Sequence, residues 1–245
     1  MELLCKFTRL SSLTSSQNTY NIRAFLNDVG GEYPDVLVGF FLNRIRSIDV
    51  NDTSASISDR FEPIPHPRFK DCFEKAIGSP SILQLLRDVR DESYKSDKNY
   101  YYRRLFRILS NDFSSDSIEI LDEWVNQNDK ELLIAVCDLI IEAKSDFLFK
   151  YPEFVNSLIL KSSKLDETCH KKVWKTLFHI AQFEQRTGSI REPFPLDIKI
   201  RDKSEEFASK YPKNSLTRKF YLNLAGFSNK RIEESILEDE ELFER

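Results

Sequence analysis

Apolar side chains recur at helical spacing through most of this chain, most clearly between residues 117 and 182. Residues three and four apart lie on one face of a helix, so each stripe marks a face to be buried. The stretch contains no glycine and one proline. It therefore predicts successive amphipathic helices, with stripes formed by Ile120, Leu121, Trp124 and Val125; Leu132, Leu133, Val136, Leu139 and Ile140; Phe154, Val155, Leu158 and Ile159; and Val173, Trp174, Leu177, Ile180 and Ala181.

The same periodicity predicts helices outside this region. An apolar face runs from Val36 to Ile45, and Pro34 suits the first turn of that helix. Ser79 and Pro80 form a typical helix start. Further helices are predicted over residues 98–109, 196–210, 215–225 and 229–243, while Gly30 and Gly31 predict a flexible break.

Two stretches interrupt the helices, residues 49–67 and 187–195. Residues 49–59 are rich in Asp, Ser, Asn and Thr, and prolines then follow at positions 63, 65 and 67. Alternate prolines favour an extended, polyproline-like path. Two interpretations of residues 49–67 stay open: a connector whose Phe61 and Ile64 pack along the helices, or a strap that binds a partner.

The middle of the chain contains repeated shapes. Residues 120–140 and 154–181 each predict helix, short turn, helix, with an offset of roughly 34 to 40 residues, which is within the tetratricopeptide and HEAT/armadillo periods. The fixed tryptophan, glycine and alanine positions of tetratricopeptide repeats are absent. In period and helix-pair pattern, residues 80–183 resemble HEAT-like repeats.

The resemblance implies an all-α fold, an array of antiparallel helix pairs forming an α-solenoid. Residues 1–245 are then expected to form a single helical-repeat domain, with a possible sub-boundary in the loop 49–67. Such folds present extended surfaces for binding, and the resemblance brings no catalytic residues with it.

Composition and charge narrow the functional classes. Forty acidic against 36 basic residues give a net charge of −4, which supplies no global attraction to nucleic acid or anionic membranes. No segment approaches the roughly 20 apolar residues of a membrane span. The start, Met1–Phe7, lacks the basic region and long apolar run of a signal peptide. Four scattered cysteines (Cys5, Cys72, Cys137 and Cys169) without a CxxC pair predict reduced thiols, and we expect a cytoplasmic protein with no membrane partner.

No recognised catalytic or metal motif is present. Phosphate-binding glycine loops, HExxH and GxSxG are all missing. Cys169 and His170 lie near His179 in the sequence. Positions 170 and 179 point to different sides of one helix, however, so too few ligands converge to bind zinc. The abundant carboxylate pairs are interpreted as solvated helix faces. We therefore predict no catalytic residue, cofactor or metal.

The group most open to a functional interpretation lies between Lys95 and Arg107, where three tyrosines precede Arg103, Arg104 and Arg107. Tyrosines could stack on bases and arginines could pair with phosphates. The favoured interpretation is instead that the apolar side of this segment is core and that nearby carboxylates balance its cations. That core would comprise Tyr101, Tyr102, Leu105 and Phe106, and the carboxylates would be Asp88, Asp91 and Glu92.

A second basic patch comprises Lys161, Lys164, Lys171, Lys172 and Lys175.

The first functional hypothesis is a non-catalytic protein–protein interaction scaffold or regulatory module. Its expected partner is another protein, and the oligomeric state stays open. The alternative is a nucleic-acid-binding helical repeat that uses the same basic stripe. An enzyme with an unfamiliar all-α site ranks below both. The predicted partner-binding residues are Tyr100, Arg103, Arg104, Arg107, Lys171 and Lys175.

Overall fold

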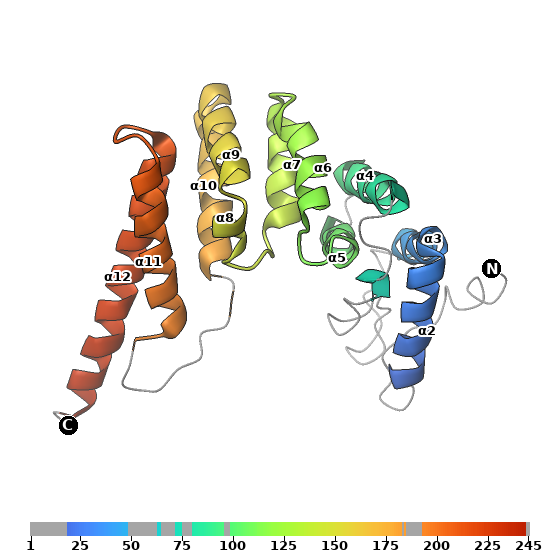
Figure 1. Cartoon of the computed structure of the whole chain (residues 1–245), viewed down its shortest axis with the longest axis horizontal. Coiled ribbons are helices and arrows are strands. Elements are labelled where there is room, and N and C mark those ends of the chain that lie inside the picture. Colours follow the sequence, from blue (N-terminus) through green and yellow to red (C-terminus); the bar gives the residue numbers. More distant parts are fainter. Residues whose placement is uncertain are drawn as a thin grey trace. The chain divides into compact units, whose positions relative to one another are not determined.

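The computed structural model describes residues 19–48, 63–64, 72–74, 80–95, 99–182, 184 and 193–243. Every regular element in these ranges is a helix, and they contain no strand (Figure 1). The predicted all-α class is therefore confirmed. The chain divides into two compact units, residues 1–121 and 122–245.

The first unit is built from helices that pack on their neighbours in sequence. α2 packs on α3, α3 on α4, and both α3 and α4 on α5. Its core includes Leu37, Phe41, Leu86 and Phe106, each no more than 1% exposed. The helices are α2 (Thr19–Glu32), α3 (Pro34–Arg46), α4 (Pro80–Lys95), α5 (Asn99–Leu109) and most of α6 (Ser115–Val125), so Pro34 begins its helix as predicted.

The flexible break predicted at Gly30 and Gly31 is wrong, because α2 continues through both residues to Glu32. A Cβ atom on Gly30 would lie 2.0 Å from the carbonyl oxygen of Cys72. Gly30 is thus used for a close approach of two backbones rather than for flexibility. This lets a distant segment pack directly on α2.

The predicted loop at 49–67 is described at Pro63 and Ile64 only. Ile64 is completely buried, and the Pro63 carbonyl accepts a hydrogen bond from Arg44 Nε at 3.0 Å. Arg44 itself is fully buried on α3. These contacts favour the connector interpretation for this pair of residues; Phe61 and the rest of the loop lie outside the described residues.

In the second unit, helices pack on a sequence neighbour and also on helices further along the chain. α9 and α10 lie side by side, joined by the single residue Asp166, and α10 also packs on α7 (Figure 1). α9 contacts α12, which packs along α11. The elements are the end of α6, α7 (Lys130–Ile140), the short α8 (Phe147–Lys150), α9 (Pro152–Leu165), α10 (Glu167–Gln182), α11 (Pro195–Lys210) and α12 (Leu216–Phe243).

The two helices predicted over 215–225 and 229–243 form one continuous helix, α12. Gly226 lies within it and has nothing within 4 Å of its Cβ position. A single exposed glycine costs a helix only about 1 kcal/mol. The packing of Phe227 against Phe178 of α10, with ring centroids 6.3 Å apart, continues the buried face past that point.

Pairs of helices adjacent in sequence, such as α4 with α5, α9 with α10 and α11 with α12, pack together in both units, as helix-pair repeats require. Their arrangement as a solenoid and the single domain over 1–245 stay predictions. None of the described helices is both long enough and apolar enough to cross a membrane.

Candidate functional site

Helix α5 has two chemically opposite faces. Tyr102, Leu105, Phe106 and Leu109 are at most 2% exposed and pack into the core of the first unit. Positions 100, 103, 104 and 107 follow the i, i+3, i+4, i+7 pattern and share the other side of the helix. We call Tyr100, Arg103, Arg104 and Arg107 the α5 stripe.

Tyr100 and Arg104 form the exposed end of the α5 stripe. The Tyr100 side chain is 49% exposed. The Arg104 guanidinium carbon lies 5.8 Å from the centroid of its ring, in a cation–π contact. The Tyr101 ring meets Tyr100 edge-on at 5.3 Å. The stripe therefore begins with a half-exposed aromatic ring that already contacts a cation.

Arg107 is held at the other end by a turn that follows α5. Its Nε donates to Asp112 Oδ1 at 2.8 Å. Asn111, Asp112 and Phe113 all have positive φ angles, between 49° and 69°. The Phe113 side chain is buried against Phe106, with ring centroids 6.3 Å apart, and this packing holds a backbone conformation that a bulky residue rarely adopts. The turn fixes the carboxylate that orients Arg107.

The carboxylates named from the sequence contact residues outside α5. Asp91 accepts from Arg90 Nε at 2.9 Å, Glu92 pairs with Arg46 at 3.2 Å, and Asp88 accepts from Gln84. The counterion that the structure gives Arg107 is Asp112, which sequence analysis missed because a left-handed turn, not helical spacing, brings it into reach. Tyr102, Leu105 and Phe106 are core as predicted, whereas Tyr101 is half-buried.

Arg103 lies between these two ends and is half-buried. Its Nε is buried without a hydrogen-bond partner in the structure. An arginine donor buried in this way has unused hydrogen-bonding capacity. The α5 stripe therefore carries three guanidinium groups within two helical turns.

The remaining predicted residues, Lys171 and Lys175, lie four apart on α10 in the second unit. Lys171 pairs with Glu167 at 2.6 Å, and both side chains are exposed. The neighbouring Lys172 pairs with Asp138 of α7 at 2.8 Å. Two of the five lysines of the second basic patch, Lys171 and Lys172, are thus paired with carboxylates of the same unit.

The Cys169–His170 region holds a polar contact that the sequence did not reveal. His170 Nδ1 lies 3.0 Å from Ser162 Oγ of α9. The Ser162 hydroxyl donates to the Ile159 carbonyl at 3.1 Å and is completely buried, so it accepts from His170 and is unsuited to act as a nucleophile. Within the described residues, no three histidine, cysteine or acidic side chains come together as metal ligands.

Burial lowers the pKa of His170 below its ordinary value of 6.5. The folded protein then binds fewer protons here than the unfolded chain, so stability is retained above pH 6.5 and is lost as the pH falls toward the folded-state pKa. We expect urea midpoints to fall on acidification through this range, before the carboxylates titrate. The slope should disappear in His170→Gln, because glutamine does not titrate in this range. An equal slope in His170→Gln and in the natural sequence would contradict this assignment.

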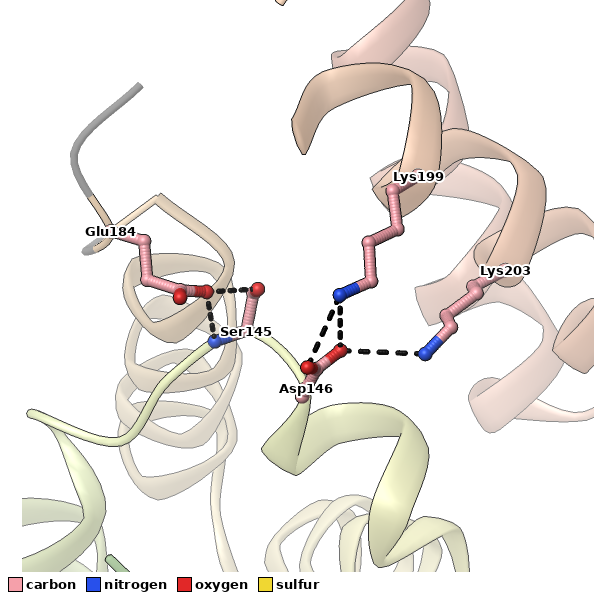
Figure 2. Close-up of polar contacts among 5 residues, drawn as sticks. All are labelled: Ser145, Asp146, Glu184, Lys199 and Lys203. Carbon is pink, nitrogen blue, oxygen red and sulfur yellow. Dashed lines mark hydrogen bonds and ion pairs between the residues drawn. The ribbon is translucent and has the colours of Figure 1, made fainter. Parts of the chain in front are cut away.

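A second polar group joins the loop before α8 to two distant segments (Figure 2). Glu184, beyond α10, accepts hydrogen bonds from the backbone N and the hydroxyl of Ser145. Asp146 is contacted by Lys199 at 3.0 Å and by Lys203 at 3.3 Å, both from α11. The hydrogen bond from Lys199 is the main cause that lowers the pKa of Asp146. The exposed Asp146 carboxylate remains ionised and fastens α8 to α11, which is a structural role.

Comparison with known proteins gives no identification. No protein-family model, no curated protein and no solved structure matches this chain. The functional conclusion therefore rests on the residues above.

Proposed function

We propose that this chain is a non-catalytic helical-repeat module, arranged as an α-solenoid, that binds another protein through the α5 stripe. Lys171 and Lys175 contribute a second contact region on α10. The module works in the cytoplasm and uses no cofactor. The observation that carries this proposal is the chemistry of α5: an apolar face committed to the core and an opposite face of one tyrosine and three arginines.

Tyrosine and arginine are the residue types most enriched at the energetic centres of protein interfaces. Contacts already present within the α5 stripe limit the side-chain freedom that binding would cost. Arg104 contacts the Tyr100 ring, and Asp112 holds Arg107. A surface ordered before binding loses less conformational entropy when a partner arrives.

Nucleic-acid binding is the second candidate, favoured by the exposed Tyr100 ring on which a base could stack. The cations of the second unit argue against an extended phosphate groove. Lys130 pairs with Asp166 at 2.9 Å, Lys171 with Glu167 and Lys172 with Asp138. Phosphates would have to replace these carboxylates, so we rank a protein partner first.

The test is affinity capture of partners from the native host with the double variant Arg103→Glu/Arg104→Glu. We expect partner affinity to fall about tenfold to a hundredfold, which corresponds to roughly 1.4–3 kcal/mol. Mass spectrometry reads the recovered proteins, with and without nuclease. Thermal unfolding of the same variant shows whether the fold is retained, and Tyr100→Ala provides a second variant that leaves Arg103 in place.

The matched control is Lys213→Glu/Lys219→Glu, which changes the net charge equally at two exposed positions of the second unit. It should recover partners as the natural sequence does. Unchanged recovery with Arg103→Glu/Arg104→Glu would refute the α5 stripe as the binding surface. If nuclease abolishes the recovery of partners and the chain binds labelled RNA or DNA in a salt-sensitive way, the partner is nucleic acid rather than a protein.

A further inference from the structure

Arg103 carries a hydrogen-bond donor that the fold buries and leaves unused. The residue is half-buried in the middle of the α5 stripe, and its buried Nε atom has no hydrogen-bond partner within the described part of the chain. Most buried polar groups in folded proteins have such a partner. Folding has therefore removed water from this donor without supplying a protein acceptor. An acceptor brought by a ligand would gain this hydrogen bond without paying again for desolvation of the donor.

The two neighbouring arginines of the α5 stripe already make contacts of their own. Arg107, one helical turn further along, pairs with Asp112 at 2.8 Å. The guanidinium carbon of Arg104 lies 5.8 Å from the centroid of the Tyr100 ring. Three cations at positions 103, 104 and 107 repel one another, so a negative charge brought to Arg103 would be favourable there.

The geometry of the arginine end group favours a carboxylate as that negative charge. Nε and the adjacent Nη lie on one edge of the planar guanidinium group, and two parallel N–H bonds along this edge fit the two oxygens of a carboxylate. Because Arg103 is only half-buried, rotation about its side-chain torsions would bring this edge to the surface. The proposed partner is a protein, so the carboxylate is that of an aspartate or glutamate side chain.

Tyr100 offers a second contact beside Arg103. It lies three positions earlier on α5, and its side chain is 49% exposed. Side chains three apart on a helix have Cβ atoms about 5–6 Å apart. In an extended peptide, alternate side chains project from the same side and are about 6.6 Å apart. A carboxylate and an apolar side chain two positions apart in an extended peptide therefore match the spacing of Arg103 and Tyr100.

We propose that the α5 stripe recognises an extended acidic segment of its partner. In that segment an aspartate or glutamate binds Arg103, and an apolar or aromatic side chain two positions away packs on Tyr100. This inference rests on the proposed function, because it names the chemistry of the partner at the same surface.

The test selects random peptides displayed on phage for binding to the full chain. The selected peptides should share an aspartate or glutamate two positions from an apolar or aromatic residue. A synthetic peptide of the commonest selected sequence should bind Arg103→Gln about tenfold to a hundredfold more weakly than the natural sequence, as measured by fluorescence anisotropy. Arg103→Lys keeps the charge but not the planar fork, so its affinity should lie between the two. Lys213→Glu/Lys219→Glu should bind as the natural sequence does.

Arg103→Met separates binding from folding. Methionine keeps an unbranched side chain but removes the unused donor, so the urea midpoint should be no lower than that of the natural sequence while peptide binding is lost. A lower midpoint would show that Arg103 serves the fold through an acceptor of its own, and it would overturn the proposal.

The proposal would also be overturned by a selection that yields no shared acidic residue, or by a selected peptide that binds Arg103→Gln as tightly as the natural sequence. These failures are distinct from failure of the proposed function. If Arg103→Glu/Arg104→Glu loses a captured protein while the selected peptides lack an acidic residue, the carboxylate chemistry alone is refuted. If that double variant captures its partner unchanged, the α5 stripe itself is refuted as the binding surface.

Discussion

Replacing Gly30 with alanine is expected to destabilise the first unit by about 2–3 kcal/mol, although alanine is the better helix residue. The new Cβ atom would lie 2.0 Å from the Cys72 carbonyl oxygen and 2.9 Å from Leu37. The obstacle at Cys72 is backbone, which cannot rotate away as a flexible side chain can. Either α2 or the segment at Cys72 and Phe73 must move, and both of those side chains are buried.

Two other helical glycines provide the control. Gly39 in α3 and Gly226 in α12 have nothing within 4 Å of their Cβ positions. Alanine at either position should raise the free energy of unfolding by about 0.5–1 kcal/mol through helix propensity alone. The same substitution is thus expected to have opposite signs at different sites. Equal stabilisation at all three would show that α2 and the Cys72 segment do not approach closely in solution.

Urea unfolding followed by circular dichroism measures these changes through the helices of both units. Both tryptophans, Trp124 and Trp174, belong to the second unit, so fluorescence reports on that unit. If the units unfold together, Gly30→Ala shifts both signals. If they unfold separately, it shifts the dichroism transition and leaves the fluorescence transition in place. The experiment therefore also tests the single domain predicted over residues 1–245.

Replacing Tyr221 with alanine is expected to destabilise the second unit by about 4 kcal/mol. Its ring is fully buried at the centre of an aromatic group from α8, α11, the turn that follows α11, and α12. Ring centroids lie 5.2–6.1 Å away, at Phe149, Phe207, Tyr211 and Phe220. Its hydroxyl donates to the Leu148 carbonyl at 2.8 Å. Burial raises the pKa of this hydroxyl, which stays protonated and remains a donor.

Tyr221→Phe separates the hydroxyl from the ring. It keeps the packing but leaves the buried Leu148 carbonyl without this donor, which should cost about 1–2 kcal/mol. Leu222→Ala is the control, because the adjacent side chain is 48% exposed and should contribute less than about 0.5 kcal/mol. Urea unfolding followed by tryptophan fluorescence measures all three variants. A Tyr221→Phe variant as unstable as Tyr221→Ala would mean that the hydroxyl, rather than the ring, holds α8 in place.

Much of the helical architecture could be predicted from periodicity. Most of the apolar positions predicted on α7, α9 and α10 are buried as their spacing indicates, whereas Leu132 and Trp174 are half-buried, and α5 separates its apolar side from Tyr100 and the arginines. Such patterns are local, because the face on which a residue lies depends only on its position along one helix. The α5 stripe could be named from the sequence for this reason, while its role as a binding surface stays a prediction.

The contacts that depend on residues far apart in the chain could not be predicted. Asp146 meets Lys199 and Lys203 across more than 50 residues, and Glu184 reaches back to Ser145. The sequence has many carboxylates and lysines, and nothing local distinguishes these pairs from the others. Gly226 illustrates the same limit, since a glycine ends a helix or sits within one depending on what packs around it.

The sequence by itself determined that this protein is helical, and it determined which face of α5 carries Tyr100 and its three arginines. Both follow from the geometry of a single helix. Only the tertiary structure decided that the Cys72 backbone packs directly on Gly30 and that Asp112 pairs with Arg107. It also decided that α12 is longer than α11, on which it packs. These features arise where separate segments meet, and close packing between segments is set by the whole fold rather than by any local pattern.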